Sequence, residues 1–112
     1  MSTGFAATPE PPYYAVIFTS QRTCPDDGYA ETAEAMFELA KKQPGFLGAE
    51  SARGPDGFGI TVAYFRDEAA IRAWKENTQH LAAQAKGKSG WYSRYQIRIA
   101  KAGRSYTGPE GR

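Results

Sequence analysis

The segment that most constrains the fold is residues 46–65, which is typical of a β-hairpin. Residues 46–53 and 58–65 are rich in aromatic, β-branched and small side chains, as strands commonly are. Between them lies a four-residue turn, Gly54-Pro55-Asp56-Gly57. In such a turn Pro sets φ at the first central position, Asp bonds to nearby backbone and Gly tolerates positive φ. The pattern therefore predicts two adjacent antiparallel strands.

A strand and a helix are predicted before the hairpin. Residues 13–20 carry apolar side chains on both alternating faces, which indicates a central strand that is covered on both sides. Residues 29–42 place apolar side chains three and four positions apart, as the buried stripe of a helix requires. This stripe consists of Tyr29, Ala33, Met36, Phe37 and Ala40. Pro44 and Gly45 follow it and are expected to end the helix.

A second helix and a last strand are predicted after the hairpin. Asp67 is expected to cap the N-terminus of this helix, and Gly87 is expected to end it. Its buried stripe is predicted to consist of Ile71, Trp74, Thr78, Leu81, Ala82 and Ala85. Residues 91–100 alternate as a final strand. The order strand, helix, strand, strand, helix, strand predicts the ferredoxin-like α+β fold, a four-stranded sheet with both helices on one face.

The second face of such a sheet has no helix to cover it. The strands at 13–20 and 58–65 are apolar on both faces, so we do not expect that second face to meet water. Burial of apolar area contributes roughly 25 cal/mol per Å², which favours association through this face. We therefore predict a homodimer in which a second subunit covers the sheet.

Composition limits the classes of binding partner and the cellular location that we expect for this protein. The net charge of +2 is too balanced to indicate a nucleic acid or an anionic membrane as a partner. Cys24 is the only cysteine, which excludes an internal disulfide and a Cys-based metal site. Nothing matches a signal peptide or the roughly 20 apolar residues of a membrane-spanning helix, so we expect no membrane partner and a cytoplasmic location.

We expect three segments along the chain. Residues 1–12 are predicted to form a disordered arm, because Pro11 and Pro12 oppose a helix. Residues 13–106 are predicted to form the folded domain. Residues 107–112 are predicted to form a flexible tail, because they are polar and rich in glycine.

Several short motifs in the predicted domain resemble a known family. They are Gln43-Pro44-Gly45-Phe46-Leu47-Gly48, the run Gly59-Ile60-Thr61-Val62-Ala63-Tyr64-Phe65, Ala70 with Trp74 and His80, and Trp91-Tyr92 with Tyr95 and Arg98. Together they are similar to the antibiotic biosynthesis monooxygenase (ABM) family. The resemblance implies a dimeric α+β barrel, in which two ferredoxin-like sheets face each other with the helices outside. The family includes oxygenases that act on aromatic polyketides and quinols without a cofactor, haem-degrading enzymes, and members without an assigned activity. The resemblance therefore implies one of these activities or a function that is not catalytic.

The resemblance points to a substrate pocket beside Trp74. In the family, a tryptophan at this place in the second helix lines the cleft between helix and sheet. The same residue equally suits a core position that fills the gap between helix and sheet. Strand side chains with aromatic bodies or polar tips are expected to form the opposing wall, and the candidates are Tyr14, Phe18, Tyr64 and Tyr95. A phenol hydroxyl in that wall can hold the oxygen of a quinol.

His80 and Gln21 are further candidate pocket residues, taken from the haem-degrading relatives. Those relatives bind haem iron through a histidine of the second helix, at a longer spacing from the tryptophan than the six residues here. On a continuous helix His80 would lie about 120° from Trp74, so a structural histidine is the preferred interpretation. Gln21 stands where those relatives carry Asn, and Ala70 stands where some polyketide oxygenases carry Asn. We therefore expect no metal ligand and no cofactor, with haem as the less favoured alternative.

Three functions remain open at this stage. The first is a cofactor-independent monooxygenase that acts on a small aromatic or quinol-type substrate. The second is a non-catalytic dimer that binds a small molecule in the same cleft or takes part in a stress response. The third is a haem-binding or haem-degrading protein. No motif requires a catalytic side chain, so no catalytic residue is assigned.

Overall fold

The computed structural model describes residues 4–23, 29–84 and 92–109. Its elements follow the predicted order and are β1 (Tyr13–Arg22), α1 (Tyr29–Lys41), β2 (Phe46–Arg53), β3 (Phe58–Phe65), α2 (Glu68–Gln84) and β4 (Tyr92–Ala102). The two hairpin strands have the predicted bounds, whereas β1 and β4 each extend two residues beyond their predicted ends. The predicted helix end at Gly87 and strand start at Trp91 lie outside the described residues.

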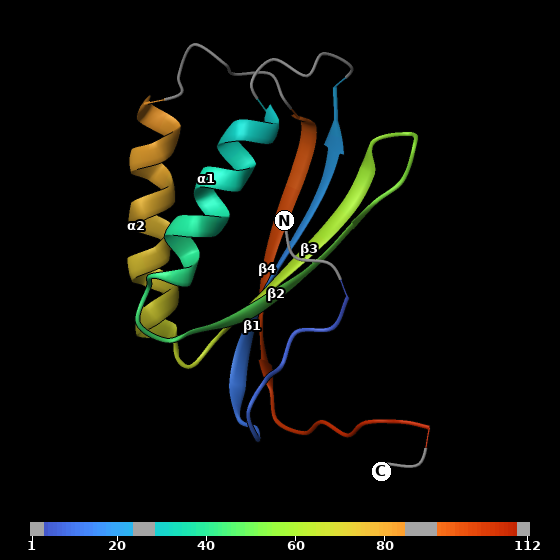
Figure 1. Cartoon of the computed structure of the whole chain (residues 1–112), viewed down its shortest axis with the longest axis vertical. Helices are drawn as coiled ribbons and strands as arrows, with labels where there is room; N and C mark the ends of the chain where they lie inside the picture. The colour runs from blue at the N-terminus through green and yellow to red at the C-terminus, as the bar shows by residue number, and fades with distance from the viewer. Residues whose placement is uncertain (1–3, 24–28, 85–91, 110–112) are drawn as a thin grey trace.

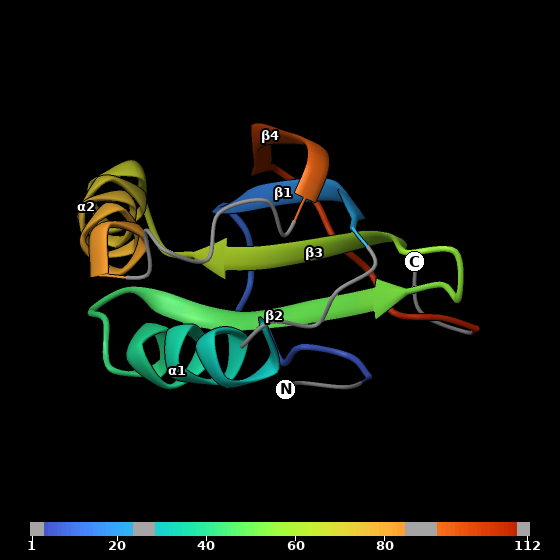
Figure 2. The same ribbon diagram turned by 90° about the horizontal axis from the view of Figure 1, so that it is seen from above.

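The four strands form one antiparallel sheet in the order β2-β3-β1-β4, as Figure 2 shows. This is the ferredoxin-like arrangement predicted from the order of elements. The strands β1 and β3 occupy the two central positions, which agrees with their apolar side chains on both faces.

Both helices lie on one side of the sheet (Figure 1). The core on this side is centred on Phe65 of β3 and on Ala70 and Ile71 of α2, all of which are buried. Half-buried apolar side chains pack around that centre, namely Tyr14, Val16, Phe46, Ala63 and Trp74. The predicted stripe of α1 contributes the buried Ala40. We call this face of the sheet the helix side and the opposite face the open side.

The connections follow the predicted turn chemistry. At the hairpin, Gly54 N donates to Phe58 O at 2.9 Å and Asp56 Oδ1 accepts from Phe58 N at 3.1 Å. Gly57 adopts a φ of +91°, which only glycine adopts readily. After α1, Gly45 has a φ of +85°, and a Cβ there would lie 2.8 Å from the Cβ of Ala70. Glycine at this position therefore permits close approach of α2.

The N-terminus of α2 is capped as predicted. Asp67 Oδ1 accepts a hydrogen bond from Ala70 N at 2.8 Å, which satisfies one of the amides that a helix start leaves unpaired. That hydrogen bond is the main cause that lowers the pKa of Asp67, and Arg66 assists. At mid-helix, Asn77 Nδ2 donates to Gln43 Oε1 at 2.8 Å and joins α2 to the segment that follows α1.

Residues of the N-terminal segment contact the open side. Ala6 N donates to Glu50 Oε2 at 3.0 Å, and Thr8 Oγ1 lies 3.2 Å from the hydroxyl of Tyr13. Disorder of residues 1–12 as a whole stays a prediction. Farther along the same face, Phe58 and Ile60 are 48% and 41% exposed. Apolar surface is thus left uncovered on the open side near the hairpin.

Among the described residues, neither helix has the length and apolar composition needed to cross a lipid bilayer.

Candidate functional site

Strand alternation divides the candidate residues between the two sides of the sheet. Side chains of Tyr14, Phe18 and Tyr95 share the helix side with Trp74, because each belongs to the cross-strand rows that face α2. Side chains of Tyr64 and Gln21 belong to the alternate rows and lie on the open side. One site therefore does not contain all the candidates. Their role in substrate binding stays a prediction.

Trp74 is half-buried on the helix side, next to the core. It packs against the cluster of Phe65, Ala70 and Ile71. It therefore stands at the border between packed core and accessible surface, where the core and pocket interpretations are compatible. The side chain of His80, farther along α2, lies outside the described part of the chain.

An aromatic cluster lies on the helix side beyond the core, and it consists of Phe18, Tyr92 and Tyr95. The ring of Phe18 is 5.3 Å from that of Tyr92 and 5.6 Å from that of Tyr95, between centroids. The two tyrosine rings are 6.2 Å apart. Tyr95 is 60% exposed, and its neighbours Ile97 and Ile99 on the same face of β4 are also exposed. This part of the helix side offers flat apolar surface to a ligand.

Polar groups lie beside the aromatic cluster, on β2 and β3. The hydroxyls of Ser51 and Thr61 form a cross-strand hydrogen bond of 2.8 Å. One row farther on, the guanidinium of Arg53 donates to the hydroxyl of Ser20 at 2.7 Å. Toward the hairpin turn, the helix side is therefore polar at Ser51 and Arg53 of β2 and apolar over β4, an arrangement that can orient a flat ligand with one polar edge.

Arg53 is the residue that sequence reasoning missed. It ends a predicted strand next to a turn, where an arginine is usually an ordinary solvent-exposed side chain. The structure pairs Arg53 with Gly59, over which a long side chain can lie flat. A four-residue turn over residues 54–57 would instead pair Arg53 with Phe58, so the predicted turn contained no signal for this contact.

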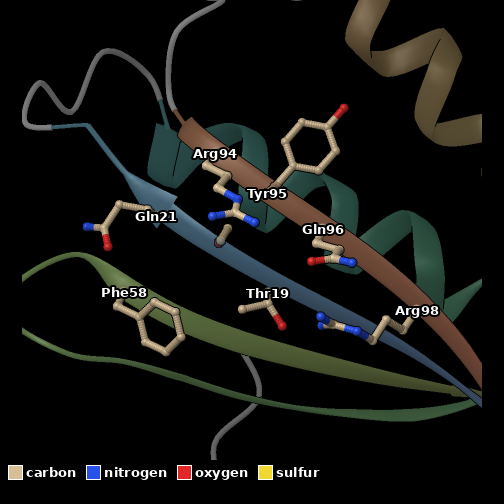
Figure 3. A pocket seen from close by; sticks show the side chains of 8 residues that line it. Thr19, Gln21, Phe58, Arg94, Tyr95, Gln96 and Arg98 are labelled. Carbon is tan, nitrogen blue, oxygen red and sulfur yellow. The ribbon is translucent and has the colours of Figure 1, made fainter.

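The open side contains a separate hollow of about 160 Å³, shown in Figure 3. Its polar lining consists of Thr19, Ser20, Gln21, Arg94, Gln96 and Arg98. In Figure 3 the side chains of Arg94 and Arg98 extend over the open side, whereas Tyr95 points away from it. Ligand pockets commonly enclose about 300–1,000 Å³, so this hollow alone is small for an aromatic guest.

Tyr64 and Gln21 make structural hydrogen bonds on the open side. The hydroxyl of Tyr64 donates to Glu50 Oε1 at 2.6 Å. Burial, followed by this hydrogen bond and the charge of Glu50, raises the pKa of Tyr64 to about 12. Gln21 Nε2 donates to Asp56 O at 2.7 Å and ties the end of β1 to the hairpin turn.

No group of three or more His, Cys, Asp or Glu side chains within residues 4–23, 29–84 and 92–109 is arranged to hold a metal ion.

Comparison with known proteins identifies relatives of this chain. The family model for antibiotic biosynthesis monooxygenases matches residues 14–86. A Bacillus subtilis protein described as the uncharacterized protein YqjZ is 57% identical over 97 residues, which cover 87% of this chain and 85% of that protein.

Two solved structures illustrate the shared fold. SnoaB from Streptomyces nogalater, described as a cofactor-independent oxygenase, has a TM-score of 0.67 at 13% identity over 85% of this chain and 97% of its own. A monooxygenase from the gene ActVA-Orf6 of Streptomyces coelicolor, solved with nanaomycin D, has a TM-score of 0.64 at 18% identity over 88% and 94%. The structural likeness supports the fold, and the family model spans well over half of the sequence. The chain therefore belongs to the antibiotic biosynthesis monooxygenase family.

Proposed function

We propose that this protein is a cofactor-independent oxygenase that oxidises a flat aromatic substrate of the quinol or anthrone type. Membership of the monooxygenase family supports the reaction class. The observation that carries the proposal is the aromatic cluster of Phe18, Tyr92 and Tyr95 on the helix side, beyond the half-buried Trp74. Tyr95 is exposed, and the other two rings are half-buried. Such a surface accepts a planar ring system by stacking and by apolar contact.

The proposed chemistry needs no protein-borne redox group. An ionised quinol or anthrone is electron-rich, and it can donate an electron to O₂ directly. For an anthrone, one oxygen atom of O₂ enters the ring carbon as a carbonyl, and the other leaves as water with the two hydrogens of the methylene. The protein then contributes by orienting the substrate, excluding water and stabilising the oxyanion.

We assign substrate contact to the helix-side residues Phe18, Trp74 and Tyr95. Tyr14 is left out because it lies about 20 Å along β1 from the cross-strand row of Tyr95. The contact of Trp74 with the core fixes one edge of the proposed site. The exposed Tyr95 gives the ligand an accessible ring at the other edge. Tyr64 and Gln21 are not part of this proposed site, because their side chains lie on the open side.

We also propose that the protein acts as a homodimer through the open side. The exposed Phe58 and Ile60 support this, because they leave apolar area on a sheet face that neither helix covers. Ile60→Asp should convert the dimer to a monomer in light scattering on a size-exclusion column, whereas Ile99→Asp on the helix side should leave it dimeric. A wild-type protein that stays monomeric at micromolar concentration would contradict the proposal.

Oxygen consumption tests the catalytic proposal. Purified protein without added metal or cofactor is mixed with a panel of quinols and anthrones, and O₂ uptake is recorded with an electrode against protein-free controls. Turnover that Trp74→Ala reduces supports an oxygenase. Tight binding of the same compounds without protein-dependent O₂ uptake would instead support a non-catalytic binding protein.

A further inference from the structure

Arg53 lies across the sheet on the helix side. The register places Arg53 of β2, Gly59 of β3, Ser20 of β1 and Tyr95 of β4 in one cross-strand row. A Cβ at Gly59 would lie 2.8 Å from Cζ of Arg53. The side chain therefore passes directly over Gly59 and reaches the central strand, a path that a larger residue at position 59 would block.

The guanidinium of Arg53 is held in a defined orientation. Its Nη2 donates to Ser20 Oγ at 2.7 Å, and its Nη1 donates to the backbone oxygens of Ser20 and Gly57. Ser20 is only 2% exposed, so the central strand provides a rigid anchor. These three bonds use three of the five N–H groups of arginine. Within the described part of the chain, the N–H of Nε and one N–H of Nη2 have no acceptor, and these adjacent donors match the two oxygens of a carboxylate.

This oriented cation borders the aromatic cluster. Cζ of Arg53 lies 5.9 Å from the ring centroid of Tyr92, and the Tyr92 ring in turn contacts Phe18. Within the described residues, no ion pair joins Arg53 to a carboxylate. The helix side therefore combines a flat apolar surface with a positive charge at its edge that no carboxylate of the described residues pairs with.

We propose that Arg53 binds the carboxylate of an aromatic acid whose ring lies on Phe18, Tyr92 and Tyr95. This inference rests on the proposed function and narrows its substrate to quinols or anthrones that carry a carboxylate. Arg53 acts as a specificity residue, because its fixed fork favours an anionic edge over a neutral edge of the same shape. Electron transfer to O₂ takes place elsewhere on the substrate ring and does not involve the arginine.

A matched pair of probes tests the inference by binding alone. The probes are 2-naphthoate and 2-naphthamide, which share ring and shape and differ in charge, and calorimetry measures both affinities at pH 7.5. Wild-type protein should prefer the carboxylate by about tenfold to a hundredfold, the range of a hydrogen bond to a charged group. Arg53→Gln should abolish this preference and change the affinity for the amide by less than about twofold.

Two further variants sharpen the result. Arg94→Gln removes an arginine from the open side and should leave the carboxylate preference intact. Arg53→Lys keeps the charge but loses the planar fork, so it should lower the affinity for naphthoate about tenfold, and it serves if Arg53→Gln does not fold. A wild-type protein that does not bind naphthoate at millimolar concentration would overturn the inference. So would equal losses for both probes in Arg53→Gln, or an unchanged affinity for naphthoate in either Arg53 variant.

The binding readout separates this inference from the oxygenase proposal. A carboxylate preference that depends on Arg53, found in a protein that consumes no O₂ with any aromatic acid, would sustain the site and overturn the oxygenase. Turnover of neutral quinols, together with no effect of Arg53→Gln on the binding of either probe, would sustain the oxygenase proposal and overturn the carboxylate site.

Discussion

The hydrogen bond between Tyr64 and Glu50 offers a direct test of how the open side is stabilised. The O–H···O distance of 2.6 Å to a carboxylate is that of a charge-assisted bond. Glu50 also accepts from Ala6 N, so this carboxylate joins the N-terminal segment to the sheet. Tyr64→Phe removes the hydroxyl and leaves the ring, including its edge contact with Tyr13 at 5.7 Å between centroids.

The expected loss of unfolding free energy depends on how far Tyr64 and Glu50 are exposed to solvent. A buried hydrogen bond to a charged group contributes about 1.5–3 kcal/mol, but solvent screening reduces this for a partly exposed pair. We expect Tyr64→Phe to lower the free energy of unfolding by about 1 kcal/mol, equivalent to a fall in Tm of about 4 °C for a domain of this size. Tyr14→Phe is the matched control on the helix side, and its effect should stay within about 0.5 kcal/mol.

The same bond predicts a specific pH dependence. The pKa of Tyr64 is raised to about 12 in the folded protein, whereas an unfolded tyrosine titrates near its ordinary value of about 10. A raised folded pKa means that the stabilisation is complete below pH 10 and is lost as the pH rises from 10 to 12. The difference in stability between wild type and Tyr64→Phe should therefore shrink over this range.

Urea unfolding followed by circular dichroism measures both effects. Curves are recorded at pH 7.5, 10 and 11.5, at one protein concentration because a dimer unfolds in a concentration-dependent way. Equal free energies of unfolding for Tyr64→Phe and wild type at pH 7.5 would refute the reasoning. So would an alkaline loss of stability that is the same in both proteins.

Three further outcomes are expected. Asp67→Ala should lower the urea midpoint of unfolding at pH 7, because it removes the cap on Ala70 N. The pKa of Asp67 is lowered in the folded protein, so the difference from wild type should disappear as the pH falls and the folded Asp67 carboxyl becomes protonated. A difference that stays constant with pH would contradict this. Trp74→Ala should weaken binding of flat aromatic ligands about twofold to tenfold while the fold persists, because an aromatic contact contributes about 0.5–1.5 kcal/mol. Calorimetry measures this, and unchanged binding would place the site elsewhere. A haem titration followed by absorbance should show no stoichiometric complex that depends on His80, and a complex abolished by His80→Ala would reverse that interpretation.

The order and type of the elements could be predicted from local sequence. The hairpin is specified by Pro55, Asp56 and Gly57, whose backbone preferences act within the turn itself. The cap at Asp67 and the helix end at Gly45 are equally local, and the structure confirms both. Short motifs around Gly45, Trp74 and Tyr95 pointed to the correct family, which the family model confirms.

The side of the sheet on which each strand residue lies could only be decided by the tertiary structure. Alternation in β1 and β3 shows that Tyr14 and Tyr64 belong to definite rows, but both rows are apolar, so neither is marked as the helix side. The packing of Ala70 and Ile71 against Phe65 identifies the row of Phe65 and Tyr14 as the helix side. Tyr64 therefore lies on the opposite face of the sheet from Trp74. Sequence alternation alone therefore could not sort the candidates into one site.

The place of Arg53 depended even more on the tertiary fold. Its contact with Ser20 joins residues 33 positions apart and crosses an intervening strand. Local propensity acts over a few residues, and it determined where β2 and β3 begin and end. Which side chains meet across three strands depends on the register of two separate pairings and on the absence of a side chain at Gly59, and those are properties of the assembled sheet.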